Sequence, residues 1–145
     1  VMLTQGGLLK NFTKIVHKFC KENDDNAEIA EFIEPLATLN KEWGDLTTQI
    51  GMRAMANQEE IGAAAVDYLM YSGYITLAYF WAVMAKAAKE QLAAGTSEEG
   101  FYTAKVQTAK FYFKRILPRT KSLVDTVNAG LDSLMDMEVD NFGFY

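Results

Sequence analysis

The chain has 145 residues but only one cysteine, one histidine and two prolines. The lone cysteine, Cys20, excludes an internal disulfide and is typical of proteins in a reducing, cytoplasmic compartment. The lone histidine, His17, excludes the paired Glu-x-x-His motifs with which helical bundles hold di-iron or di-manganese centres. The scarcity of proline leaves long stretches of backbone able to form uninterrupted helices. We therefore expect a cytoplasmic, helical protein without a metal site.

Catalytic and nucleotide-binding motifs are also missing. His17 lies on a basic helix face without an orienting carboxylate, which argues against Ser-His-Asp chemistry. The pair Gly6-Gly7 is not a phosphate-binding loop, because Lys10 does not stand at P-loop spacing. Cys20 is on the apolar side of its helix, where a buried, inert thiol is expected rather than a nucleophile. The sequence thus predicts no catalytic, cofactor-binding or metal-ligating residue in this chain.

The net charge of −5 argues against a nucleic-acid-binding surface. One stretch is nevertheless basic, since no acidic residue lies between Glu99 and Asp125. Its basic residues are Lys105, Lys110, Lys114, Arg115, Arg119 and Lys121. Because acidic residues elsewhere outweigh this stretch, we expect it to be either a solvated helix face or a contact with an anionic partner domain.

Residues 68–85 form a run of eighteen residues without a charge. This is near the lower limit for a membrane-spanning helix. However, the run contains four tyrosines, Ser72 and Thr76, and it continues into a longer helical pattern that covers residues 59–92. The mean hydropathy of the whole chain is also close to neutral, at −0.06. We therefore predict a helix buried on nearly all sides within a soluble bundle, and no membrane span.

Apolar residues recur at helical spacing in four segments, at residues 7–22, 27–56, 58–92 and 98–129. Three segments have a predicted inner face, made of Leu8, Phe12, Ile15 and Phe19; of Ile29, Phe32, Leu36, Leu39, Trp43, Leu46 and Ile50; and of Tyr102, Val106, Ala109, Phe113 and Ile116. The short connections predict an all-α fold, an antiparallel up-down four-helix bundle with residues 68–85 at its centre.

Glycines and prolines set the expected ends and bends of these helices. Gly95 is suited to a helix C-terminal cap, and we expect the last helix to end at Gly130. Pro35 and Pro118 each stand inside a periodic pattern, so we expect kinks at both positions.

Asp67 is the only charged residue between Glu60 and Lys86. On a mostly buried helix, an unpaired carboxylate would cost several kcal/mol. When the last helix folds back about Gly95, residues near 119–123 come level with Asp67. We therefore predict a buried, structural ion pair with a basic residue of that helix, first Arg119 and otherwise Arg115 or Lys121.

The C-terminal residues combine acidic and large apolar side chains. The apolar members are Met135, Met137, Phe142, Phe144 and Tyr145. Because such side chains are costly to leave in water, we expect this tail to dock against another surface.

Three blocks of sequence carry a resemblance to a known family. They are IGAAAVDYLMYSGYITLAYFWAVMAKAA, FYTAKVQTAKFYFKRILP and AGLDSLMDMEVDNF. Together they strongly resemble the C-terminal helical extension of bacterial FAD-dependent acyl-CoA dehydrogenases, and the opening VMLTQGGLLKNF is similar to the stretch that leaves the catalytic domain. The likeness covers nearly the whole chain. It is most specific at residues 67–86 and 101–118, and loose in the second helix.

The resemblance implies a full-length enzyme that oxidises an acyl-CoA thioester to the 2,3-enoyl form. In similar enzymes a glutamate removes the α proton and FAD takes a hydride from the β carbon, and both parts precede the extension. It also implies that the extension packs on the catalytic core and on neighbouring subunits of a homo-oligomer. Within one domain of residues 1–145, residues 1–25 would then be the linking helix, 26–130 the three long helices, and 131–145 the acidic-aromatic tail.

Two functions remain open from the sequence. The first is a structural, oligomer-forming accessory domain of an acyl-CoA dehydrogenase, which alone binds no FAD and is inactive. The second is a free-standing helical module for protein interaction. A reading frame with several hundred residues upstream of Val1 would support the first, and an initiator methionine just before Val1 would favour the second.

Overall fold

The computed structural model describes residues 6–143, and within them every regular element is a helix. The elements are α1 (Gly7–Lys21), α2 (Ala30–Ala56), α3 (Glu59–Ala93), α4 (Glu99–Phe111), the π-helix η2 (Tyr112–Ile116), the 3₁₀ helix η3 (Leu117–Arg119), α5 (Thr120–Ala129), α6 (Asp132–Met135) and the 3₁₀ helix η4 (Val139–Phe142). The prediction of an all-α fold is confirmed. Expectations about residues 1–5 and about Phe144 and Tyr145 fall outside the described residues.

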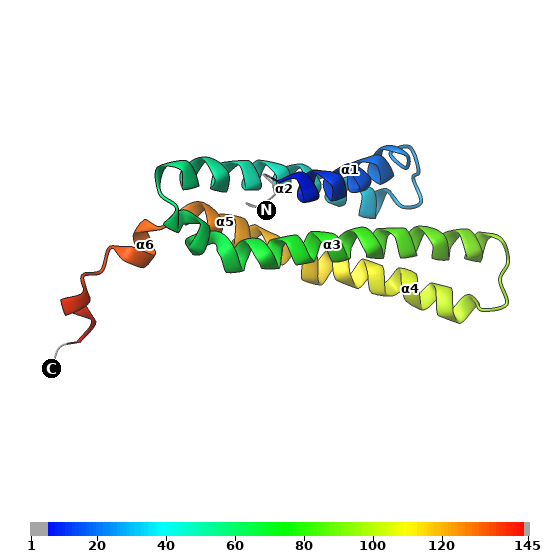
Figure 1. Ribbon diagram of the computed structural model, residues 1–145. Helices are drawn as coiled ribbons and strands as arrows, with labels where there is room; N and C mark the ends of the chain where they lie inside the picture. Colours follow the sequence, from blue (N-terminus) through cyan, green and yellow to red (C-terminus); the bar gives the residue numbers. More distant parts are fainter. Residues whose placement is uncertain (1–5, 144–145) are drawn as a thin grey trace.

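Consecutive long helices run in alternating directions (Figure 1). The helix α3 is central, because α2, α4 and α5 all pack against it, while α1 packs on α2. Phe12 and Phe19 of α1 also contact the ring of Tyr79 on α3, with ring centroids 5.7 and 5.5 Å apart. None of the described helices combines the length and the apolar character that a membrane crossing requires.

The core lies along the predicted seam of α2 and one side of α3. From α2, Phe32, Leu36 and Leu46 are at most 2 % exposed. They face a row of α3 side chains that are completely buried: Tyr71, Ile75, Ala78, Ala82 and Ala85. The small alanines permit close approach of the neighbouring helices, and this close packing positions the rest of α3.

The turn between α3 and α4 follows the predicted glycine cap. Gly95 has φ +77°, which L side chains rarely adopt. The N–H of Thr96 donates to the carbonyl of Gln91 (3.3 Å), and the N–H of Gly95 donates to that of Leu92 (3.2 Å). These two bonds form a Schellman motif, which satisfies carbonyls at the end of the helix. The chain can therefore reverse direction within a few residues.

The last predicted helix is not continuous between residues 98 and 129. It is divided into α4, η2, η3 and α5 around Pro118. Proline has no N–H, and its ring crowds the carbonyl four residues earlier, here that of Lys114. The backbone accommodates this by widening to a π-turn before Pro118 and tightening to a 3₁₀ turn at it. By contrast, α2 continues through Pro35.

The predicted inner face of the first helix is partly wrong. Leu8 and Ile15 are 70 % and 53 % exposed, whereas Val16 and Cys20 are buried. The apolar stripe of α1 is wide enough to offer two adjacent lines of residues. The helix is rolled so that the line through Val16 and Cys20 faces α2 and α3.

Candidate functional site

The side of α3 that faces away from the other helices is apolar. Its exposed side chains are Val66 (72 %), Leu69 (70 %), Met70 (46 %), Leu77 (50 %), Phe80 (50 %) and Met84 (36 %), and we name this surface the α3 apolar face. Positions 66, 70, 73, 77, 80 and 84 alternate steps of four and three, which places them on one side of a helix. The surface extends over roughly 27 Å at 1.5 Å per residue.

The prediction that residues 68–85 are buried on nearly all sides is therefore wrong. That prediction assumed that every apolar side of the helix has a neighbour within this chain. The neighbouring helices cover only the side that carries Tyr71, Ile75 and Ala82. A folded chain rarely leaves so long an uncharged apolar surface in water unless another molecule or domain covers it.

Two glycines form gaps in this side of α3. Gly62 and Gly73 are eleven residues apart, which is close to three full turns, so they share one side of the helix. A Cβ atom added at either position meets nothing within 4 Å. Glycine within a helix costs about 0.5–1 kcal/mol relative to alanine, and nothing inside the domain requires it here. The gaps would let the backbone of a partner approach α3 closely.

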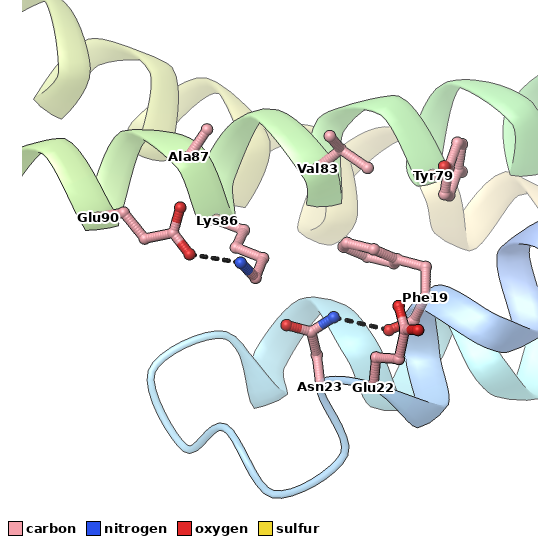
Figure 2. Close-up of a pocket in the computed structure, with 8 residues that line it drawn as sticks. All are labelled: Phe19, Glu22, Asn23, Tyr79, Val83, Lys86, Ala87 and Glu90. Carbon is pink, nitrogen blue, oxygen red and sulfur yellow. Dashed lines mark hydrogen bonds and ion pairs between the residues drawn. The ribbon is translucent and has the colours of Figure 1, made fainter.

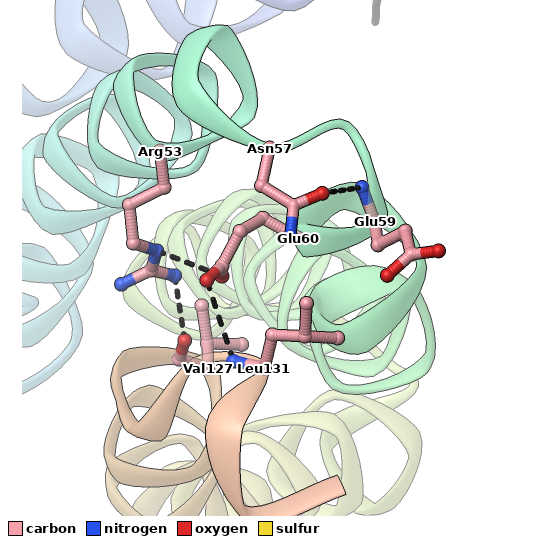
Figure 3. A network of polar contacts seen from close by, with 6 residues as sticks. All are labelled: Arg53, Asn57, Glu59, Glu60, Val127 and Leu131. Atoms are coloured by element: carbon pink, nitrogen blue, oxygen red, sulfur yellow. Dashed lines mark hydrogen bonds and ion pairs between the residues drawn. The ribbon is translucent and has the colours of Figure 1, made fainter. Parts of the chain in front are cut away.

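A polar network ties the α2–α3 corner to the end of α5 (Figure 3). Arg53 Nη2 donates to the carbonyl of Val127 (2.7 Å), one of the last carbonyls of α5. Arg53 Nε lies 3.3 Å from Glu60 Oε2, with side chains 29 % and 15 % exposed. This contact is Coulombic only, since neither atom makes a hydrogen bond. Glu60 Oε1 in turn accepts the N–H of Leu131 (3.4 Å).

The predicted ion pair of Asp67 is wrong. Asp67 is only half-buried, and no basic group of residues 6–143 lies within salt-bridge distance of it. Arg119 and the other proposed partners, Arg115 and Lys121, are exposed. The pair that joins distant elements is Arg53–Glu60 instead. The sequence signal for it was the position of both residues beside the α2–α3 corner.

We expect Glu60→Gln to destabilise the domain by about 1–2 kcal/mol, below the 3–5 kcal/mol of a fully buried pair because both side chains are partly solvated. The variant keeps an oxygen for Leu131 and removes only the charge facing Arg53. Urea unfolding measures the effect. Asp67→Asn and the exposed neighbour Glu59→Gln are matched controls, each expected within about 0.5 kcal/mol of the original protein. A larger loss for Asp67→Asn than for Glu60→Gln would contradict this assignment.

Two shallow grooves on the described residues are candidate ligand sites. The larger, about 460 Å³, lies between the end of α1 and α3 and is lined by Phe19, Glu22, Asn23, Tyr79, Val83, Lys86, Ala87 and Glu90 (Figure 2). Its only basic group, Lys86, is paired with Glu90. The second, about 280 Å³, is lined by His17, Cys20, Lys21, Asp24, Ile33, Glu34 and Ala37, so its basic groups share the groove with two carboxylates. Neither groove offers the cluster of donors that a pyrophosphate requires, so the residues present do not fit a flavin.

The sequence-derived candidates for chemistry do not come together. His17 is exposed, Cys20 is 4 % exposed, and the side chain of Asn23 donates to the carbonyl of Phe19 (2.7 Å). Among residues 6–143, no three His, Cys, Asp or Glu side chains are grouped as a metal ion would need. What the described residues present to a partner is therefore a surface rather than a reactive centre.

Burial raises the pKa of the Cys20 thiol from its usual 9.0 to about 11. The native state thus holds this proton more tightly than the unfolded chain. The resulting stabilisation is complete below pH 9 and is lost as the pH rises through about 11. We expect Cys20→Ala to remove this part of the pH dependence of unfolding. A Cys20 that alkylates as fast in the native protein as in urea at pH 8 would contradict the burial.

Comparison with known families places this surface in context. A family model described as acetyl-CoA dehydrogenase C-terminal like matches residues 12–138. A search of curated proteins finds no significant match to the chain. The family match includes residues 12–21 of α1, all of α2 to α5 and the following residues up to 138, hence the whole α3 apolar face. The chain therefore belongs to the family of acetyl-CoA dehydrogenase C-terminal-like domains, which occur in acyl-CoA dehydrogenase-like enzymes.

Proposed function

We propose that this domain is the C-terminal accessory part of an FAD-dependent acyl-CoA dehydrogenase. Its role is to pack on the catalytic core through the α3 apolar face and to support assembly of the enzyme's subunits in the cytoplasm. The family match supports the kind of enzyme. The observation that carries the role is the row of exposed apolar side chains on α3, which no other part of residues 6–143 covers.

The chemistry of the face favours a large protein partner over a small ligand. The surface is long, convex and uncharged, whereas small-molecule sites are concave and combine apolar walls with a few polar groups. The alternation of bulky side chains with Gly62 and Gly73 matches the ridges and grooves by which helices pack on one another. We therefore infer that the covering element is a helix, or a pair of helices, of the catalytic core.

The dehydrogenation itself is assigned to the part of the enzyme upstream of this domain. FAD would supply hydride acceptance there, and a positioned carboxylate would remove the α proton. The residues of this chain are assigned to contact and assembly, and none of them to proton or hydride transfer.

We expect the purified chain to bind no FAD and to oxidise no acyl-CoA. Fluorescence titration with FAD and dye reduction with medium- and long-chain acyl-CoA measure both properties. The positive control is the polypeptide encoded by the whole gene, which we expect to bind flavin stoichiometrically and to turn over. Flavin binding or turnover by residues 1–145 alone would place the active site in this chain and overturn the proposal.

A further inference from the structure

Residues 131–143 leave the helical body at Gly130 (Figure 1). Gly130 has φ +73°, and the next N–H, of Leu131, is held by Glu60. From there residues 132–143, which we call the tail, run away from the helices instead of folding back along α5 (Figure 1). The network around Arg53 thus sets where the tail starts.

The tail combines large apolar side chains, which are costly to expose to water, with acidic residues. Its large apolar side chains are Leu134, Met135, Met137, Val139 and Phe142, each more than half exposed. Its charged residues are all acidic, namely Asp132, Asp136, Glu138 and Asp140. A segment of this composition fits a surface that is basic and also offers apolar contact.

Such a surface exists on the same domain. Phe111, Lys114, Arg115, Arg119 and Lys121 are exposed along the end of α4, η2, η3 and the start of α5, and we call them the basic face. The buried residues of the same stretch lie between these exposed ones and face the core; they are Tyr112, Phe113, Leu117 and Thr120. No ion pair within residues 6–143 involves the four basic residues of this face. Phe111, 58 % exposed, adds the apolar contact.

We propose that the tail of one copy docks on the basic face of a second copy, and that the exchange is reciprocal. Four acidic groups then meet four basic groups, and each domain contributes both surfaces, as a two-fold symmetric interface requires. The direction of the tail favours docking in trans, because its own basic face lies back along the helical body. This inference deepens the proposed role in assembly and assumes only that copies of the domain meet.

Two charge-reversed variants of the full chain test this exchange. One carries Arg115→Glu and Arg119→Glu; the other carries Asp136→Lys and Asp140→Lys. Alone, each variant has one of its two surfaces brought to a net charge of zero, so the attraction between tail and face is lost and sedimentation should show dimerisation at least about tenfold weaker than in the original protein. In an equimolar mixture the unaltered acidic tail of one variant meets the unaltered basic face of the other, so one of the two reciprocal contacts is restored and dimers should return. Raising the salt from 50 to 500 mM should weaken the original dimer, as screening requires.

The controls separate this exchange from other contacts. Lys10→Glu with Lys14→Glu makes the same charge change on exposed α1 residues and should leave dimerisation unchanged. A monomeric original protein, or a mixture that stays monomeric while both variants retain helical circular dichroism, would overturn the exchange and leave the basic face to some other acidic partner. Association that ignores the charge variants but is lost on mutating the α3 apolar face would also overturn it, and would leave the proposed function standing.

Discussion

Replacing Leu77 and Phe80 together by lysine is expected to abolish docking through the α3 apolar face while the helical fold is retained. Each side chain is half exposed in the domain, so the change should alter the free energy of unfolding little. At a covered interface the same change removes roughly half of the about 1.5–3 kcal/mol that full burial of such a side chain is worth, because the other half is already buried in the domain, and it adds two charges that must lose their water. Docking should therefore weaken by at least about a hundredfold.

Two measurements check this result. In the isolated domain, fluorescence of a dye that binds apolar surface should fall several-fold. In the full-length enzyme, the domain should become sensitive to limited proteolysis and the thermal midpoint should drop. Leu8→Lys with Ile15→Lys is the matched control, since it alters two exposed apolar residues of α1. If the control and the α3 variant behave alike, the effect comes from changing any exposed apolar residues, and the α3 apolar face has no special role in docking.

Leu36→Ala is expected to destabilise the domain by about 2–5 kcal/mol, because Leu36 is completely buried and the truncation leaves a cavity. The same substitution at Leu8, which is 70 % exposed, should cost less than about 0.5 kcal/mol. Urea unfolding of both variants measures the difference. The pair also tests the orientation of α1, since the sequence pattern places Leu8 on the inner face. Equal losses would show that the roll of α1 is wrong.

Local rules predicted the helices well because their signals lie within a few residues. Gly95 marks a reversal that only a left-handed residue permits easily, and the seam through Leu36 repeats without a slip. The interruption before Pro118 was also predictable, because proline lacks an N–H and its ring crowds the preceding turn. The sequence pattern does not, however, predict that the helix widens to a π-turn there. The roll of α1 was not predictable, because its apolar stripe offers two adjacent lines and tertiary contacts choose between them.

The candidate site could not be predicted from the periodicity of the sequence, because periodicity does not say which apolar sides of a helix are covered within the same chain. Residues 68–85 are apolar on every side, and we expected neighbours within the chain to cover all of them. The helix is apolar on more sides than the other helices of this chain can cover, and this was the signal for an external partner. The Asp67 prediction failed for a related reason: once one side of α3 faces outward, a half-buried carboxylate needs no ion partner.

The most direct test of whether the catalytic core covers the α3 apolar face is the reactivity of a thiol placed at position 77. Leu77→Cys should react quickly with an alkylating reagent in the isolated domain, while buried Cys20 contributes little background. In the full-length enzyme we expect the thiol at position 77 to react at least about tenfold more slowly, because the catalytic core would exclude the reagent from the α3 apolar face. A thiol at Gln49, on the exposed side of α2, gives the reference rate in both proteins. Equal rates at position 77 in the domain and in the enzyme would contradict the claim that the catalytic core covers this face.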